Sequence, residues 1–413
     1  MEDLDVVVHL DGLCKPAVGG ADESGAPSLE ESFLCALGEA WVLYYPLTDR
    51  LLVLNATAKT VCDLLNQGYQ VPEIKRVFVR AFGISDERAA RDVEQVLADL
   101  THGDPAGERD PGQAGGWGDG SYVPAARRDS PADCGGFRFG QNRIRVFSSA
   151  TELDESFFLR FQHRAVNNGT EVLEISGDGC AYRLTFCGKV VAEAKTIRQT
   201  ASRLVDFLLS LEHPERPLLA ACHAAAVSRE GRSVLIPGGS GIGKSTLTAF
   251  LVANGFAYLA DDTIAIGDQG TALLPLPTCL SIKAGSWPLL EPLYPVLQRL
   301  ATLHRYGRSI RYLEPRGNYE LLQAAAAPSA IVFPAYSAGE ATRLTRVPPV
   351  QTMINLLGAH ARLSSPGSGA KLAELVRFVE RTPAYRLSYG ELTGAMNALD
   401  GLLAADVVAR KAT

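Results

Sequence analysis

Residues 222–262 read CHAAAVSREGRSVLIPGGSGIGKSTLTAFLVANGFAYLADD, and the glycine-rich segment GGSGIGKST lies near the centre of this stretch, over Gly238–Thr246. The segment satisfies the pattern GxxxxGK(S/T), which is typical of loops that bind phosphates. We expect an apolar strand over Val234–Ile236 before the loop, and after it a helix that Gly255 ends. This order predicts an α/β (α+β) domain with a nucleotide site between a strand and a helix.

Each residue type in the loop suits a polyphosphate. Glycines let backbone N–H groups point inward around the β- and γ-phosphates, and the helix N-terminus adds the positive end of its dipole. Lys244 would neutralise phosphate charge, and the Ser245 hydroxyl could ligate Mg²⁺. We therefore expect a nucleotide and Mg²⁺ here, with the nucleotide held by Gly238, Gly239, Ser240, Gly241, Ile242, Gly243, Lys244, Ser245 and Thr246.

Acidic residues and a histidine flank this loop in the sequence. Asp261 and Asp262 end the apolar segment FAYLADD, where a carboxylate would meet the metal of a nucleotide site. One Mg²⁺ needs fewer than two carboxylates, so the second could accept a proton from a substrate hydroxyl. A solvated turn is the structural alternative. Upstream, His223 lies in AACHAAAV, which predicts a strand, and such a histidine is by itself more often a packed core residue.

The spacing of these features resembles HPr kinase/phosphorylase and its relatives. His223 precedes Lys244 by 21 residues, and Asp261 follows the lysine by 17. The resemblance is strong over Cys222–Asp262 and extends over Phe137–Val407 in layout. It implies a small kinase fold, unlike that of eukaryotic protein kinases, that moves a phosphoryl group onto a serine hydroxyl.

The same resemblance implies roles at the reacting centre. Lys244 and Ser245 would hold ATP and Mg²⁺. One of the two aspartates would be the general base with His223 supporting it, and the other would hold metal; we expect Asp262 as the base and Asp261 as the ligand.

Beyond the aspartates the sequence departs from the family. The family's acidic metal ligand and glycine-rich signature loop are not recognisable in PLPTCLSIKAGSWPLLEP, over 275–292, and this stretch looks more like HPr-kinase-related proteins of peptide biosynthesis clusters. Candidates for stabilising the transferring phosphoryl group, which could equally be ordinary surface cations, are Lys283, Arg305, Arg308 and Arg311.

A second unit is predicted over residues 29–102. Apolar runs at Trp41–Tyr45 and Leu51–Leu54 indicate a β-hairpin, and three amphipathic helices follow, the last with Ser85 as its N-cap. AWVLYYPLTDRLLVLNATAKTVCDLL and the two helices after it resemble the PqqD-like precursor-peptide recognition element of ribosomal peptide pathways. The resemblance implies a small winged-helix fold that binds a leader peptide as an added strand. The alternative is a winged-helix domain for dimerisation or nucleic-acid binding.

Composition indicates the character of the remaining segments and excludes some classes of partner. Residues 1–28 are expected to be flexible, residues 103–136 form a Gly/Pro/Asp-rich linker, and residues 137–413 form the kinase domain. The net charge of −6 argues against a nucleic-acid partner. No apolar run approaches the roughly 20 residues of a membrane span, and no secretory signal is recognisable, so we expect no membrane partner and a cytoplasmic location. The eight cysteines form no CxxC pair and are expected to be reduced.

Together these observations predict an ATP/Mg²⁺-dependent kinase for a Ser or Thr hydroxyl of a ribosomally synthesised precursor peptide. Residues 29–102 would bind the leader, and the linker would raise the peptide's effective concentration at the active site. A homo-oligomer is expected, as in the family. The alternatives are a kinase of a small hydroxyl compound such as free serine, and a non-catalytic, nucleotide-gated peptide-binding module. The paired aspartates with His223 argue against the module, because pure binding needs no base.

Overall fold

The computed structural model describes residues 32–46, 49–101, 131–150, 153, 155–177, 181–305, 307–315, 325–326 and 328–411. The predictions for residues 1–28 and for most of the linker therefore lie outside the described residues. Contacts divide the chain into two compact units, Met1–Asp110 with Pro348–Arg381, and Pro111–Val347 with Thr382–Thr413.

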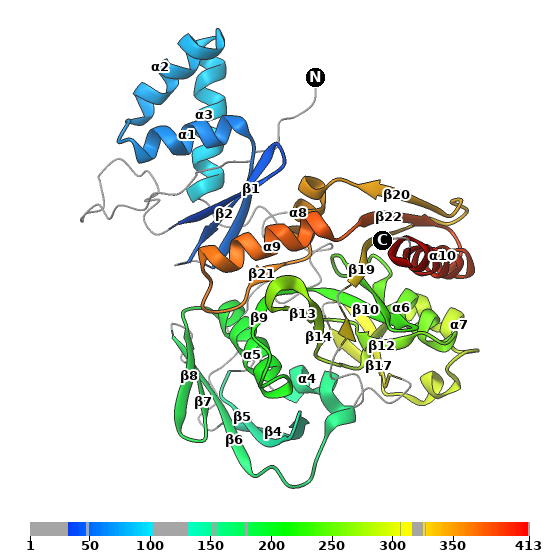
Figure 1. Ribbon diagram of the computed structural model, residues 1–413. Coiled ribbons are helices and arrows are strands. Elements are labelled where there is room, and N and C mark those ends of the chain that lie inside the picture. Colours follow the sequence, from blue (N-terminus) through cyan, green and yellow to red (C-terminus); the bar gives the residue numbers. More distant parts are fainter. Residues whose placement is uncertain are drawn as a thin grey trace. The chain divides into compact units, whose positions relative to one another are not determined.

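The first unit begins with a small sheet and three helices (Figure 1). The predicted hairpin and helices are confirmed, and Ser85 Oγ accepts a hydrogen bond from the Arg88 N–H at 3.2 Å, as expected of an N-cap. The sequence prediction missed one strand, β1, which extends the hairpin to an antiparallel sheet in the order β1–β2–β3. The elements are β1 (Phe33–Leu37), β2 (Ala40–Tyr45), β3 (Arg50–Leu54), α1 (Ala56–Asn66), α2 (Val71–Phe82) and α3 (Asp86–Thr101).

This sheet is apolar on both faces, and each face is covered. Side chains alternate along β2, so Leu43 packs with α1–α3 while Val42 and Tyr44 are buried on the opposite face. The second cover comes from far along the sequence and consists of α8 (Pro349–Gly358) and α9 (Gly369–Arg381), with β21 (Arg362–Leu363) between them in the chain. A Cβ atom on Gly369 would lie 2.8 Å from the Phe33 ring. By its contacts this segment belongs with the first unit, although it falls within the range 137–413 predicted as the kinase domain.

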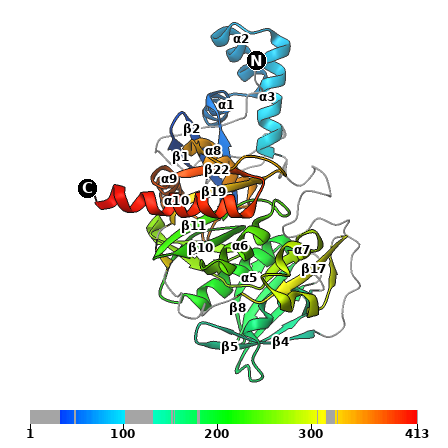
Figure 2. The same ribbon diagram turned by 90° about the vertical axis from the view of Figure 1, so that its right-hand side faces the viewer.

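A six-stranded mixed sheet forms the centre of the second unit, in the order β12–β10–β11–β19–β22–β20. Strands β11, β19 and β22 run parallel, as expected for an α/β domain. Helices α6 (Lys244–Ala253) and α10 (Leu392–Lys411) lie against this sheet (Figure 2). Leucines of both helices belong to one core with the sheet. The strands are β10 (Ala224–Arg229), β11 (Arg232–Pro237), β12 (Ala257–Ala260), β19 (Pro328–Tyr336), β20 (Arg343–Val347) and β22 (Ala384–Tyr389).

Two neighbouring chain segments cross from this sheet into a second sheet. The second sheet contains β18 (Ala325–Ala326), β14 (Ala272–Pro275), β13 (Ile264–Gly267) and β9 (Leu218–Cys222) in that order. The chain passes from β9 to β10 at His223, and from β12 to β13 through Asp261–Thr263. His223 therefore lies at a break between strands of two sheets, and its predicted position inside one continuous strand is wrong. Because β9 pairs with β13 and β10 with β12, the two breaks lie next to each other.

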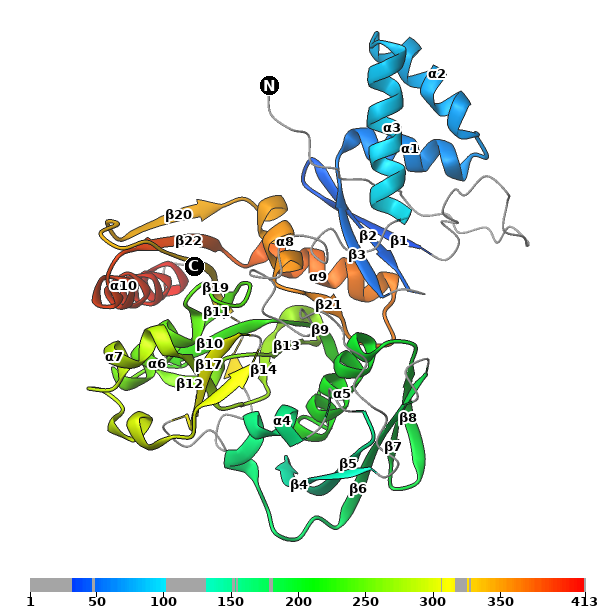
Figure 3. The ribbon, with the colours of Figure 1, turned by 180° about the vertical axis from the view of Figure 1, so that it is seen from behind.

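A third sheet, β4–β5–β6–β7–β8, packs against α5 (Ile197–Glu212) (Figure 3). Its strands are β4 (Ala132–Phe139), β5 (Asn142–Ser148), β6 (Glu171–Gly177), β7 (Tyr182–Phe186) and β8 (Lys189–Ala194). A short helical stretch, α4 (Glu155–Phe158) and η2 (Leu159–Arg164), leads from this sheet towards the site.

A small antiparallel sheet, β15–β17–β16, completes the second unit. It contains β15 (Leu280–Lys283), β16 (Leu303–Arg305) and β17 (Arg308–Leu313), and the short helices between its strands are η4 (Ala284–Ser286), α7 (Trp287–Leu290) and η5 (Pro295–Arg299). A further short helix, η3 (Asp268–Gly270), joins β13 to β14. None of the described helices is long and apolar enough to cross a membrane.

Candidate functional site

The glycine-rich loop joins β11 to α6, as the sequence predicts. Gly241 and Gly243 have φ angles of +94° and +98°, a region that residues with a Cβ atom rarely adopt. These glycines let the loop turn tightly into the helix, which begins at Lys244. The loop thereby gathers backbone N–H groups beside a helix N-terminus, a geometry suited to anions.

Lys244 turns back onto the loop. Its Nζ atom donates hydrogen bonds to the carbonyl oxygens of Gly238 (2.6 Å) and Gly239 (2.9 Å). The side chain is buried, and burial lowers the pKa of Lys244 to about 8, against the opposing effect of Asp261 and Asp262. The ammonium group is thus held at the loop in a weakly solvated position, where it would interact strongly with phosphate oxygens.

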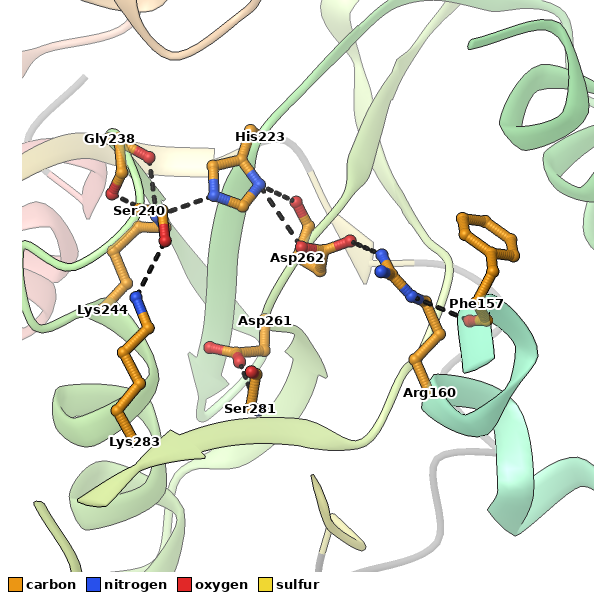
Figure 4. Close-up of polar contacts among 11 residues, drawn as sticks. Phe157, Arg160, His223, Gly238, Ser240, Lys244, Asp261, Asp262, Ser281 and Lys283 are labelled. Atoms are coloured by element: carbon orange, nitrogen blue, oxygen red, sulfur yellow. Dashed lines mark hydrogen bonds and ion pairs between the residues drawn. The ribbon is translucent and has the colours of Figure 1, made fainter. Parts of the chain in front are cut away.

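His223 links the lysine to the aspartate segment (Figure 4). Its Nδ1 atom lies 2.7 Å from the Asp262 carbonyl oxygen, which can only accept, so Nδ1 carries the proton. Nε2 of the neutral ring is then an acceptor, and the Lys244 ammonium donates to it at 3.1 Å. The histidine therefore fixes the distance between the loop and the break that carries both aspartates.

Asp262 is held by a second group. Arg160 Nη1, from η2, donates to Asp262 Oδ2 at 2.7 Å. The Arg160 guanidinium is itself positioned by Phe157, whose carbonyl oxygen accepts from Nε at 3.1 Å and whose ring lies 4.6 Å below. Burial raises the pKa of Asp262, but the positive charges of Arg160 and Lys244 outweigh this effect and hold the pKa below its usual value. Asp262 is therefore ionised and oriented.

Asp261 has a different environment. Burial raises its pKa to about 6, and hydrogen bonds from the Ser245 side chain and the Ser281 N–H oppose this shift. Its Oδ1 atom is buried without a hydrogen-bond partner among the described residues. A buried carboxylate oxygen that lacks a donor, beside a loop hydroxyl, fits a hard cation such as Mg²⁺. Among the described residues there is no group of three or more His, Cys, Asp or Glu side chains that could hold a metal by itself.

The β15–β17 hairpin brings cations to the loop. Lys283 Nζ donates to Ser240 Oγ at 2.8 Å, and Arg308 approaches Gly241. Arg311 stacks 3.7 Å over the Trp287 ring and pairs with Glu291 at 3.4 Å instead. Its partner in the sheet register is Ile282, so it lies on the face opposite Lys283 and away from the loop. The side chain of Arg305, the other candidate, lies outside the described set.

The remaining loop residues have contacts at its edges. Thr246 Oγ1 lies 2.6 Å from Ser286 Oγ, which ties the start of α6 to η4. Ile242 is exposed at the outside of the loop. The structure therefore brings the predicted loop residues, both aspartates, His223 and Lys283 together in one place, but not Arg311.

Sequence reasoning missed Arg160. Its segment, FFLRFQHR, contains no motif and lies 102 residues before Asp262. Only the packing of η2 between two sheets brings this guanidinium to the aspartate, so no local signal could have identified it.

Comparisons with known proteins agree with this layout. Residues 40–103 match the family model for coenzyme PQQ synthesis protein D (PqqD). Over 80 residues the chain is 39% identical to an HPr kinase/phosphorylase of Shouchella clausii, which covers 19% of this chain and 24% of that protein. Over 92 residues it is 33% identical to a putative HPr kinase/phosphorylase 2 of Oceanobacillus iheyensis, covering 22% and 29%. The matched stretches thus span about a quarter of the length of these relatives.

The chain joins a PqqD domain to a region similar to HPr kinase/phosphorylase. The match to the PqqD model confirms the resemblance inferred from the hairpin and its helices. In the second unit, here the HPr-kinase-like unit, the described site residues come from the glycine-rich loop and from the adjacent breaks at His223 and Asp261–Thr263. The β15–β17 hairpin adds Lys283, and η2 adds Arg160.

Proposed function

We propose that this protein is a kinase that uses ATP and Mg²⁺ to phosphorylate a Ser or Thr hydroxyl of a ribosomally synthesised precursor peptide. One observation carries the proposal: a glycine-rich loop with a buried lysine, a histidine and two aspartates lie together in a chain that also has a PqqD domain. The proposal includes a P-loop-type nucleotide site in the second unit and a winged-helix fold for the PqqD domain.

The nucleotide would lie along Gly238–Thr246, with Lys244 on its phosphates. Ser245 and Asp261 would hold Mg²⁺, because the two side chains are hydrogen-bonded and the carboxylate has an unused buried oxygen. The metal would neutralise phosphate charge as it develops in the transition state.

Asp262 is proposed as the general base. Its carboxylate is ionised at neutral pH and accepts from Arg160 at 2.7 Å, while His223 Nδ1 lies 3.5 Å from its other oxygen. It would take the proton of the peptide hydroxyl as that oxygen bonds to the terminal phosphorus of ATP and the bond between that phosphorus and the bridging oxygen breaks, so that ADP leaves. Lys283 would stabilise the charge on the transferring group, since its ammonium already lies against Ser240.

The PqqD domain is proposed to bind the leader as an added strand. Among the described residues β3 pairs only with β2, so its other edge offers backbone N–H and C=O groups. Arg50 on this strand donates to the Asp99 carbonyl oxygen at 2.9 Å, which brings α3 beside the strand. A strand edge beside a helix is the arrangement to which an extended peptide would add as a further strand.

Location and assembly follow the same proposal. The described cysteines form no disulfides and the proposed co-substrate is ATP, which together favour a cytoplasmic protein. A homo-oligomer stays a prediction from the family resemblance, and the domain limits 29–102 and 137–413 stay predictions from composition and apolar patterning.

Intact-mass spectrometry of the precursor peptide after incubation with the full chain, ATP and Mg²⁺ tests the function. We expect a gain of about 80 Da, the mass of one phosphoryl group. The gain should disappear in Asp262→Asn and Lys244→Met, and persist in Asp268→Asn, which removes an exposed carboxylate a few residues away. Phosphorylation of free serine but not of the peptide would instead identify a small-molecule kinase. Peptide and ATP binding without any phosphorylated product would identify a nucleotide-gated module.

A further inference from the structure

Two cations from one hairpin lie over the middle of the glycine-rich loop. Lys283, at the end of β15, contacts Ser240 directly. A Cβ atom built on Gly241 would lie 3.6 Å from Lys283 Nζ and 3.2 Å from Arg308 Nη1. The second cation is therefore Arg308, at the start of β17, and it is as close to the loop as the first.

The strand register explains why these two side chains share a face. Lys283 pairs with Ile310, and residues two apart in a strand point to the same side, so Arg308 lies on the side of Lys283. Arg311 pairs with Ile282 and lies on the other side. The choice between Arg308 and Arg311, open in the sequence, is thus decided by the register of the hairpin.

The placement of the two charges indicates an anion. Burial lowers the pKa of Lys283, and the neighbouring positive charge of Arg308 lowers it further, while Asp261 acts in the opposite direction. Two positive charges beside one loop create a local potential that favours an anion there. The same loop has left-handed glycines on both sides of Ile242, a backbone conformation that can turn successive N–H groups towards an anion.

The position on the loop indicates which part of a nucleotide is involved. In a loop of this pattern the backbone amides surround the β- and γ-phosphates, and the lysine of the motif reaches the same groups. Ser240 and Gly241 lie in the middle of the pattern, between Gly238 and Gly243. Cations above these two residues would meet the end of the polyphosphate chain, where the charge of a triphosphate exceeds that of a diphosphate.

We propose that Lys283 and Arg308 form a clamp for the terminal phosphate of a nucleoside triphosphate. The clamp would contact the third phosphate and so make the protein bind the triphosphate more tightly than the diphosphate. This inference rests on the nucleotide binding in the proposed function and extends it by assigning Arg308 and the selectivity. The clamp also accounts for the close approach at Gly241, where a Cβ atom would lie 3.2 Å from Arg308 Nη1.

Calorimetric binding of Mg²⁺ with a non-hydrolysable ATP analogue, and separately with ADP, to the full chain tests the clamp. The wild type should prefer the triphosphate. Lys283→Met and Arg308→Met should each weaken binding of the triphosphate at least tenfold, which is about 1.4 kcal/mol, and change ADP affinity less than twofold. Lys283→Arg and Arg308→Lys should restore part of the preference. Arg299→Met, which removes an exposed cation on η5, should leave both affinities as in the wild type.

Three outcomes would overturn the clamp. An unchanged triphosphate preference in both methionine variants, an equal loss of ADP and triphosphate affinity, or loss of the preference in Arg311→Met but not Arg308→Met would each contradict it. These results leave the proposed kinase intact, provided that Lys244→Met abolishes nucleotide binding. A wild type that binds neither nucleotide would contradict the proposed function itself, and the clamp with it.

Discussion

His223 Nδ1 lies 2.7 Å from the carbonyl oxygen of Asp262, and this hydrogen bond joins the two points at which the chain crosses between sheets. The other ring nitrogen accepts from Lys244. One neutral imidazole thus sets the spacing between the group that would bind phosphate and the group that would accept the proton.

Replacing His223 should separate these two groups. In His223→Ala we expect kcat for peptide phosphorylation to fall about a hundredfold, because small misplacements at a reacting centre carry losses of this size. The Michaelis constant for the peptide should stay within about threefold, since the ring lies far from the PqqD domain in the sequence and is buried. Steady-state kinetics with the full precursor checks this. An equal kcat would show that the imidazole only fills space.

Arg160 should act through Asp262. Arg160→Met removes the partner of a partly buried carboxylate, so we expect kcat to fall at least tenfold and stability to fall by about 1–3 kcal/mol. Arg160→Lys keeps the charge and should recover part of kcat. Arg183→Met removes an exposed arginine paired with Glu193 and is the matched control, which should change neither quantity measurably. Activity that is the same in the lysine and methionine variants would contradict a role for the charge.

His163 should make the second unit sensitive to acid. Burial lowers its pKa from 6.5 to about 3. Below pH 6.5 the unfolded chain therefore binds a proton that the folded chain does not, so stability declines as pH falls from about 6.5 towards 3. Between pH 7 and pH 5 the loss from this residue should be about 2 kcal/mol. Urea midpoints of the wild type and His163→Gln at several pH values measure it.

The variant should lose less stability than the wild type over this interval, because glutamine does not titrate. His213, whose pKa is also lowered by burial, is present in both proteins and cancels in the comparison. Parallel curves would mean that His163 is not buried in its neutral form.

Gly369 should be required for the packing of α9 on β1. Alanine is a better helix former than glycine by about 1 kcal/mol, yet a Cβ atom here would lie 2.8 Å from the Phe33 ring. Gly369→Ala should therefore lower the melting temperature. Adding Phe33→Ala removes the ring, so the alanine at 369 should cost less in that background. A stabilised single variant would show that α9 does not approach the strand this closely.

Sequence alone predicted the parts of the site whose signals are local. The loop, its flanking strand and helix, and the aspartates after an apolar strand are all readable from short patterns, and the structure brings them together. The position of His223 at a sheet break was not readable, because its neighbours on both sides are small and apolar, as in one strand.

Pairing and distant packing account for the remaining differences. Arg308 and Arg311 lie on different faces of the hairpin because of a strand register that composition does not reveal. Arg160 comes from the segment that connects β5 to β6 in another sheet. The cover over β1 and β2 comes from helices about three hundred residues later. Such contacts are set by tertiary packing and leave no periodic signal in either partner.

The cover formed by α8 and α9 has a consequence for truncated forms of this gene. These helices follow β20 and precede β22, two paired strands of the HPr-kinase-like unit, yet their apolar sides pack on the PqqD sheet. A shortened gene that begins after the linker would still encode both helices and would leave their apolar surface uncovered. Loss of the PqqD domain would thus appear first as poor folding and aggregation, before any effect on activity.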